Sequence, residues 1–138
     1  MNKNAWLFIL GCMLGTALAG APPTVSILAP AGGEYWVIGS EHGIAWTTIK
    51  GHPGTAYIGL WGYNKANQLI HLGQIAAADY LKGGYIWKVG TLADRKVGPG
   101  RYHIRISILC PSLPRMQAWL KNPIHLTAFS LPGAMRRN

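Results

Sequence analysis

The stretch Val25–Trp46, VSILAPAGGEYWVIGSEHGIAW, decides the fold. It opens with side chains that alternate between two faces, which is the period of a β-strand. A proline and the pair Gly32–Gly33 end that strand, because proline lacks a backbone donor and glycine readily adopts positive φ. A Gly-Ser turn then separates Trp36 from a second strand, in which Ile44 and Trp46 share a face. Large aromatic residues in these positions predict one hydrophobic core between two sheets.

Further segments alternate in the same way, and turn-forming residues separate them. They are residues 56–63, 68–75, 85–89, 101–109 and 124–131. The clearest is 101–109, in which Tyr102 and three isoleucines form the face expected to be buried. The opposite face, expected to be exposed to solvent, carries Arg101, His103, Arg105 and Ser107. With 18 glycines and almost no helical pattern, the chain is predicted to be an all-β sandwich of about seven antiparallel strands.

Three segments have their own local predictions. Residues 76–81 are compatible with a helix but too short to stand alone, so they are expected to form a loop or a single turn. Pro114 suits the first position of a helix, and a short helix there would place Met116, Trp119 and Leu120 on one apolar side. Tyr102 follows a glycine turn at the start of its strand, which is the position of a structural tyrosine corner.

Four short motifs occur in a recognisable order. They are I-x-x-P-x-x-G-x-x-W-x-x-G (27–39), I-x-W (44–46), G-Y-I-W-K-V (84–89) and G-R-Y-H-I-R-I (100–106). Together they resemble the fungal Ser/Thr-rich GPI-anchored membrane-protein family, which includes yeast cell-wall β-glucan assembly proteins and has relatives among secreted bacterial proteins. The resemblance implies an immunoglobulin-like sandwich at the cell surface and implies no catalytic residues. The C-terminal hydrophobic segment of a GPI signal is not seen, so wall anchoring of the fungal kind is not expected.

The first residues have the pattern of an export signal. Lys3 supplies a positive start, residues 5–18 are apolar or small, and Ala17-Leu18-Ala19 is a small-x-small cleavage pattern. We therefore expect a signal peptide at 1–19, a sandwich domain at 20–133 and a basic tail at 134–138, in a protein that is periplasmic, at the cell surface or extracellular. An alternative is a lipobox ending at Cys12, and contact with a membrane is expected only if that cysteine is lipidated.

The chain is strongly basic, with a formal net charge of +9. Cleavage of the expected signal peptide would remove Lys3 and lower this charge to +8. Such a charge favours anionic partners, among them acidic glycans and lipid headgroups, although it would also serve solubility alone. No nucleic-acid-binding motif is present and export argues against that partner, so none is expected. Cys110 would be the only thiol after cleavage, either a small buried hydrophobe or an exposed thiol that pairs with another molecule.

The residues needed for common enzyme chemistry do not form a pattern. Among four acids, Glu34 and Glu41 flank Trp36 and are expected to be solvated turn residues rather than a pair facing one glycosidic bond. The five histidines show no close metal-ligand spacing, and no G-x-S-x-G or Ser-His-acid signature appears. We therefore expect no enzyme, no cofactor and no metal.

What is left is a binding module, most simply one for cell-envelope polysaccharide or another anionic surface component. Exposed aromatic rings stack on sugar faces and arginines meet acidic groups, so the candidate ligand-binding residues are Trp61, Tyr63, Arg101, Arg105, Arg115 and Trp119. The alternative for these aromatic residues is a place in the core.

Two other functions stay open. One is a protein-interaction or assembly module that binds a surface protein through an edge strand or through residues 110–122. The other is a structural subunit of an extracellular layer, packed through the same segment and through Cys110.

Overall fold

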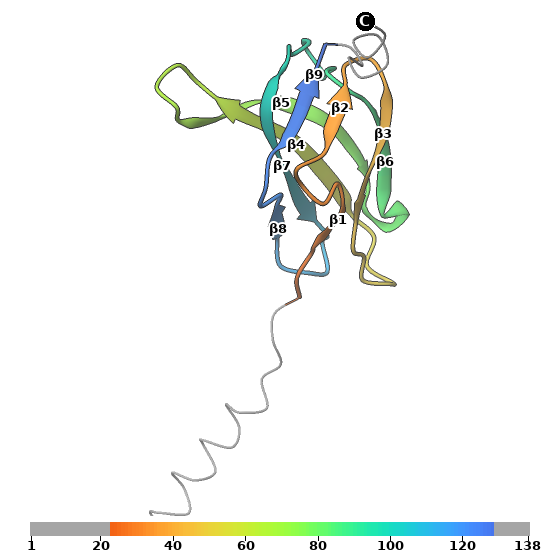
Figure 1. Ribbon diagram of the computed structural model, residues 1–138. Coiled ribbons are helices and arrows are strands. Elements are labelled where there is room, and N and C mark those ends of the chain that lie inside the picture. The colour runs from red at the N-terminus through yellow and green to blue at the C-terminus, as the bar shows by residue number, and fades with distance from the viewer. Residues whose placement is uncertain (1–22, 129–138) are drawn as a thin grey trace, which may run out of the picture.

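The computed structural model describes residues 23–128, which form two packed β-sheets (Figure 1). The strands are β1 (Ile27–Ala29), β2 (Tyr35–Val37), β3 (Glu41–Trp46), β4 (Thr55–Tyr63), β5 (Leu69–Asp79), β6 (Gly84–Lys88), β7 (Gly100–Leu109), β8 (Met116–Trp119) and β9 (Ile124–Thr127), with a single 3-10 turn, η1 (Tyr80–Lys82). The expected signal peptide at 1–19, Cys12 and the basic tail at 134–138 lie outside the described residues. No helix within 23–128 is long and apolar enough to span a membrane.

The strand order is that of an immunoglobulin-like sandwich, so the predicted fold is confirmed. One sheet has the order β1-β3-β6, and the other has the order β2-β9-β7-β4-β5, with β8 also paired to β7. If the additional strands β2 and β8 are set aside, the remaining seven occupy the A-B-E and G-F-C-C′ positions of that fold. The β4–β5 hairpin is longer than the body of its sheet and extends away from the rest of the molecule (Figure 1).

One pairing differs from the antiparallel expectation, because β2 runs parallel to β9 along Tyr35–Val37. The cause is the turn after β1, at which the chain leaves the smaller sheet and joins the edge of the larger one. Gly32 has φ +102°, and a Cβ there would lie 2.8 Å from Asn122, so a larger residue would both strain and block this crossing. The amide of Gly33 then donates to the carbonyl of Pro123 at 2.8 Å, which begins the parallel ladder.

The core lies between the sheets and contains three tryptophans. Trp36 and Trp46 are buried, as the opening stretch predicts, and Trp36 meets Trp87 edge to face with ring centroids 6.2 Å apart. Each buried indole has a partner where one is needed: Trp46 Nε1 donates to the carbonyl of Tyr80 at 2.9 Å, and Trp87 Nε1 donates to that of Thr91 at 2.7 Å. These bonds fix ring orientation in addition to the stabilisation from apolar burial.

The tyrosine corner is confirmed. The hydroxyl of Tyr102, at the start of β7, donates to the carbonyl of Gly98 at 2.6 Å. This bond closes the Gly-Pro-Gly connection against the strand that follows it. Desolvation by burial raises the pKa of the Tyr102 phenol above its ordinary value.

The prediction of a loop at 76–81 is wrong for its first part. The alanines at 76–78 continue β5, because Ile58, Tyr57 and Ala56 of β4 pair with them in register. Backbone pairing with a central strand therefore outweighs the helical preference of alanine. The expected single turn follows at η1, where Asp79 accepts a hydrogen bond from Leu81 N at 3.2 Å and Gly83 closes the turn with φ +69°.

The prediction of a helix after Pro114 is also wrong, because this segment is the strand β8. β9 pairs with β7 only along 100–102, so the rest of that edge of β7 is left with free backbone groups. β8 occupies this edge opposite residues 105–108. Met116 and Leu120 consequently point inward and are buried, whereas Trp119 lies on the opposite face of the strand and is 41% exposed.

Candidate ligand-binding face

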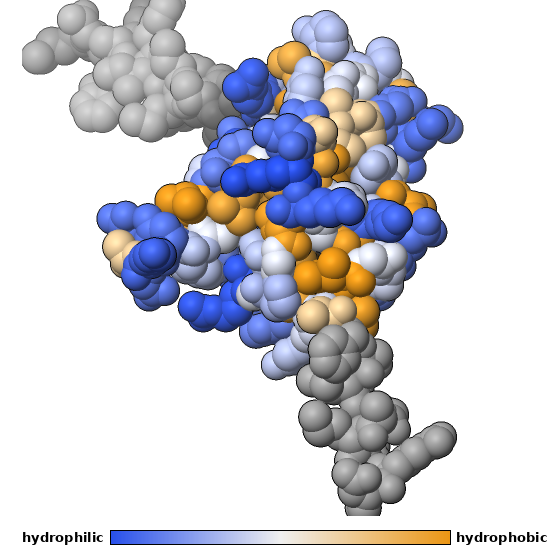
Figure 2. Space-filling model, turned by 90° about the horizontal axis from the view of Figure 1, so that it is seen from above, coloured by the Kyte–Doolittle hydropathy of each residue, from blue (hydrophilic) through white to orange (hydrophobic). Residues whose placement is uncertain are grey.

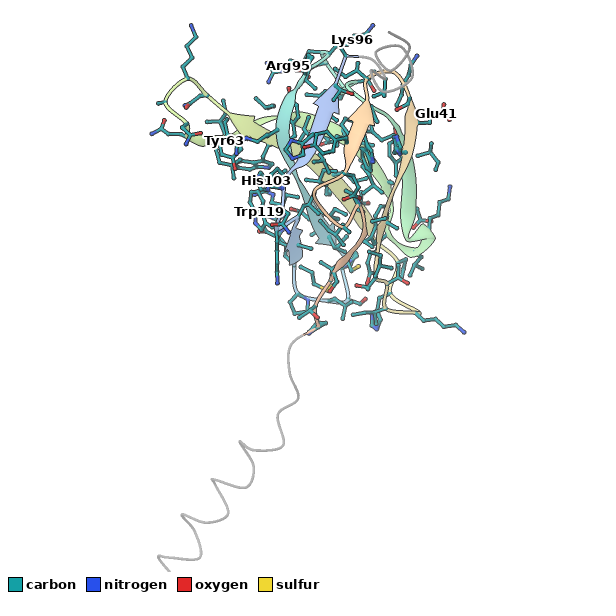
Figure 3. All side chains as sticks on the ribbon, viewed as in Figure 1. Glu41, Tyr63, Arg95, Lys96, His103 and Trp119 are labelled. Carbon is teal, nitrogen blue, oxygen red and sulfur yellow. The ribbon has the colours of Figure 1, made fainter. Side chains whose placement is uncertain are left out.

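Five of the six predicted ligand-binding residues lie on neighbouring strands of the larger sheet, and the sixth directly precedes one of these strands. Trp61 and Tyr63 belong to β4, Arg101 and Arg105 to β7, and Trp119 to β8, with Arg115 just before it. We call the solvent side of these three strands the outer face. Figure 3 shows Tyr63, His103 and Trp119 on this same side of the molecule, away from Glu41.

Arg105 lies between two indole rings. Its guanidinium is 4.9 Å from the ring centroid of Trp61 and 5.3 Å from that of Trp119, and the two indoles meet edge to face at 4.9 Å. The register explains this arrangement, since Arg105 pairs with Trp119 on β8 and with Gly59 on β4. Because Gly59 has no side chain, the guanidinium has room to turn toward Trp61. Each such contact stabilises the cluster by about 0.5–1 kcal/mol at a solvent-exposed site.

A second arginine–aromatic contact lies further along the same strands. The guanidinium of Arg101 is 4.7 Å from the ring centroid of Tyr63. Arg101 and Arg105 are four residues apart on β7, so at the rise of a strand their backbones are separated by about 13 Å. The outer face therefore repeats one pattern, a cation against an aromatic ring, at two points along its length.

His103 lies between these two contacts and corrects a prediction. It is 9% exposed rather than wet. Its Nδ1 is 2.9 Å from the carbonyl oxygen of Leu120, which can only accept, so this nitrogen holds a proton. Its Nε2 is 2.9 Å from the hydroxyl of Tyr63. His103 thus positions Tyr63 beneath Arg101 and is not itself open to a ligand.

A hollow of about 310 Å³ opens on the outer face beside Arg105. Its lining includes Tyr57, Gly59, His71, Gln74, Arg105 and Arg115. The sequence predicted Arg105 and Arg115 but not Tyr57, Gly59, His71 and Gln74. His71 and Gln74 reach the hollow because β5 has irregularities in register opposite Ile58/Gly59 and Leu60/Trp61, and strand alternation alone does not reveal such bulges.

The cationic surface continues past the outer face to the end of the molecule at the top of Figure 1. A second hollow of about 320 Å³ is lined in part by Tyr63, Arg95 and Arg101. Figure 3 places Arg95 and the adjacent Lys96 at this end, and Figure 2, which views it directly, shows strongly hydrophilic side chains beside apolar ones. Arg95 also donates to the carbonyl of Leu72, which ties its side chain to β5.

The two acids near Trp36 have different surroundings. Glu34 is half-buried rather than a solvated turn residue: its Oε2 accepts from the amide of Ala31 at 2.9 Å, and its Oε1 is buried without a partner among residues 23–128. Glu41 belongs to β3 instead of a turn, and it is exposed. Within the described residues, no group of three His, Cys, Asp or Glu side chains has the arrangement of a metal site.

Cys110 takes the first of the two roles that its sequence position allowed, because its side chain is only 2% exposed. Its Sγ lies 3.6 Å from the carbonyl oxygen of His52. Burial raises the pKa of this thiol, so it is held in the neutral form that is a poor nucleophile.

The fold and this face together define the protein as an immunoglobulin-like β-sandwich module with an aromatic and cationic outer surface. No protein-family model matches the chain, and no curated protein matches it. Among solved structures, it is similar to the fibronectin(III)-like modules of Clostridium thermocellum CbhA, with 15% sequence identity, a TM-score of 0.49, and coverage of 78% of this chain and 100% of that chain. The resemblance to the Ser/Thr-rich GPI-anchored family stays a prediction.

Proposed function

We propose that this protein is an exported, non-enzymatic module that binds a polysaccharide of the cell envelope through its outer face. The observation that supports this most is the position of Arg105 between Trp61 and Trp119. Trp119 keeps 41% of its surface exposed, although an indole of this size on a sandwich can be buried in the core. The export signal expected at 1–19 gives the protein access to such a polysaccharide.

The arrangement suits a sugar chain for two physical reasons. An indole presents a flat apolar surface that matches the C–H face of a pyranose ring, while a neighbouring guanidinium offers hydrogen-bond donors to the hydroxyl or acidic groups at the ring edge. The contacts around Arg105 come from regular strands, so the side chains are held in place before a ligand arrives. Preorganisation of this kind lowers the entropic cost of binding.

The test is co-sedimentation of the purified chain with isolated, insoluble cell-envelope polysaccharide at low and high salt. Trp119→Ala should reduce binding that persists in high salt. Ile86→Ala is the matched control, because Ile86 is 63% exposed on β6 of the other sheet and should bind as the unmodified protein does. Binding that disappears with salt alone and is indifferent to Trp119→Ala would show simple charge attraction and overturn the proposal.

A second candidate, protein assembly, has one observation in its favour. β5 is an edge strand of the larger sheet, and near the tip of its hairpin Leu69 and Ile70 are 39% and 38% exposed. Exposed edges with apolar side chains are used for strand addition. Sedimentation velocity over a range of protein concentrations tests this: oligomers that Ile70→Lys disperses would favour assembly, and a monomer throughout would remove it.

A further inference from the structure

One buried donor on the outer face has no partner. Within residues 23–128, the indole Nε1 of Trp61 is excluded from solvent and has no hydrogen-bond partner. Buried polar groups in folded proteins are nearly always paired, so a donor of this kind needs an explanation, and an acceptor from outside the chain, water or a ligand, supplies one. Trp46 and Trp87 in the core show the normal situation, since both of their indole nitrogens donate to backbone carbonyls.

The unpartnered nitrogen lies beside a vacant position above Gly59. A Cβ built on Gly59 would be 3.6 Å from Trp61 Nε1 and 3.3 Å from His71 Nε2. Gly59 itself lines the hollow of about 310 Å³, together with His71 and Arg105. Gly59 and His71 therefore belong to the lining of the hollow, and Trp61 Nε1 lies behind it, next to the position that a side chain at Gly59 would occupy.

The groups around this position are mostly donors. Trp61 Nε1 and the guanidinium groups of Arg105 and Arg115 can only donate hydrogen bonds, and both arginines are positively charged. His71 contributes a second ring nitrogen, which donates when protonated. A donor-rich site with two cations is complementary to an acceptor that carries negative charge, which is the chemistry of an oxyanion.

We infer that the hollow above Gly59 binds a single oxyanion substituent, a carboxylate or a sulfate ester, on a sugar of the polysaccharide. This inference rests on the proposed function and adds to it the class of ligand: an acidic polysaccharide rather than a neutral one. Arg105 and Arg115, which line the hollow, donate to the oxygens of the anion and neutralise its charge, and Trp61 Nε1 lies next to the bound group, behind Gly59. The volume is at the lower end for ligand pockets, which fits one substituted sugar rather than a long segment of chain.

The bulges in β5 explain how the site arises. Between the pairs Leu60↔Gly73 and Trp61↔His71, β5 has one extra residue, which brings His71 opposite Trp61. The resulting ring contact has centroids 5.1 Å apart. Bulges of this kind commonly redirect side chains beside binding sites, and a regular ladder would have placed Leu72 opposite Trp61 instead.

The experiment compares chemically matched polymers. The purified chain is run by affinity electrophoresis in gels containing polygalacturonate, which has one carboxylate per sugar, or its fully methyl-esterified form, in which the same carboxylates are neutral. Dextran sulfate and dextran form the second matched pair. We expect retardation by polygalacturonate or dextran sulfate and much weaker retardation by the neutral partner of each. Which acidic polymer binds distinguishes a carboxylate from a sulfate ester.

Gly59→Ala is the diagnostic variant, because its methyl group would occupy the position next to Trp61 Nε1 and His71 Nε2. It should weaken binding of the acidic polymer by about tenfold to a hundredfold, as expected for loss of a hydrogen bond to a charged group. Gly43→Ala on β3 is the matched control, since a Cβ there meets only Ile86, at 3.9 Å, and binding should be unchanged. Urea unfolding of both variants shows whether each is folded under the conditions of the binding assay.

A second readout follows the indole itself. In a ¹H–¹⁵N spectrum, the Nε1–H resonance of Trp61, assigned with Trp61→Phe, should shift when oligogalacturonate or a sulfated oligosaccharide is added. No shift of this resonance, or equal binding of the acidic and neutral polymers, or unchanged binding by a folded Gly59→Ala would each overturn the inference. In all three cases co-sedimentation with envelope polysaccharide would still decide the proposed function separately.

Discussion

The hydroxyl of Tyr63 lies 2.9 Å from Nε2 of His103 and joins β4 to β7 beneath the outer face. The other ring nitrogen of His103 bonds to the carbonyl of Leu120 at 2.9 Å, so the buried imidazole has a partner on each side. In the tautomer that carries its proton on Nδ1, Nε2 accepts a hydrogen bond from the hydroxyl of Tyr63. The bond fixes the phenol ring on which Arg101 stacks. One polar contact therefore stabilises the sheet and also shapes its surface.

Tyr63→Phe removes this hydrogen bond but keeps the ring. We expect the free energy of unfolding to fall by about 1–3 kcal/mol, because Nε2 of a buried histidine is left without a partner. Urea denaturation measures the change, and Tyr35→Phe is the control, since Tyr35 is 72% exposed. Equal stability of the two variants would mean that water replaces the hydroxyl at His103.

Trp87→Ala should be the most damaging of the substitutions considered for stability. Trp87 is 1% exposed, packs edge to face on Trp36 and donates to the carbonyl of Thr91. Removing a buried indole from a core costs about 3–5 kcal/mol, a large part of the stability of a small domain. Urea denaturation should show this loss, whereas Trp119→Ala on the outer face should cost less than half as much. Similar losses for both variants would contradict the division between core and surface tryptophans.

The sandwich could be predicted from the sequence because each strand has a local pattern of alternating residues. Trp36, Ile44 and Trp46 are buried as the opening stretch indicates, and the alternation of Tyr102 and the isoleucines after it matches the structure of β7. Period-two alternation depends only on which face of a strand meets the core, so it can be read from residues near one another in the chain. The Tyr102 corner was predictable for the same reason.

What could not be predicted depends on pairing between distant residues. The strand β8 forms because β9 leaves part of the edge of β7 free, and β2 turns parallel because the chain crosses between sheets at Gly32. His103 lies on the expected wet face of β7, but Tyr63 and the carbonyl of Leu120 enclose it. Neither partner is near His103 in the chain.

The candidate site shows the same division. Five of the six predicted residues lie on adjacent strands, and Arg115 directly precedes β8, because large aromatic and cationic side chains on the polar side of a strand are visible in the sequence. His71 and Gln74 were missed, since the bulges that bring them to the hollow change the alternation of β5. Gly59 was missed because its contribution is the space left by an absent side chain.

The thiol of Cys110 should make stability depend on pH in a defined window. Burial raises its pKa above the ordinary value of 9.0, so the unfolded chain loses this proton at a lower pH than the native protein does. The stabilisation is complete below pH 9.0 and is lost as the pH rises through the native pKa. Tyr102, whose pKa is raised from 10.0, adds the same effect only at higher pH.

Between the pKa of Cys110 in the unfolded chain and its higher pKa in the native protein, the free energy of unfolding should therefore fall with increasing pH. The fall is at most about 1.4 kcal/mol per pH unit for one proton. Cys110→Ala should be less stable overall because it leaves a small cavity, yet its stability should change less over this window. Urea denaturation at several pH values compares the two slopes. A slope that is the same in both proteins would assign the pH dependence to another group.

The last prediction concerns the two arginines of β7. Arg101→Ala/Arg105→Ala removes both cation–aromatic contacts of the outer face, and binding to an acidic polysaccharide should weaken and become less sensitive to salt. Lys50→Ala/Lys88→Ala removes the same charge from exposed positions outside this face, one of them on β6. Stability should fall by only about 1–2 kcal/mol in the arginine variant, because its side chains are at most half-buried. Affinity electrophoresis across a salt series measures both pairs, and equal losses in the two would show that net charge, and not the outer face, attracts the polymer.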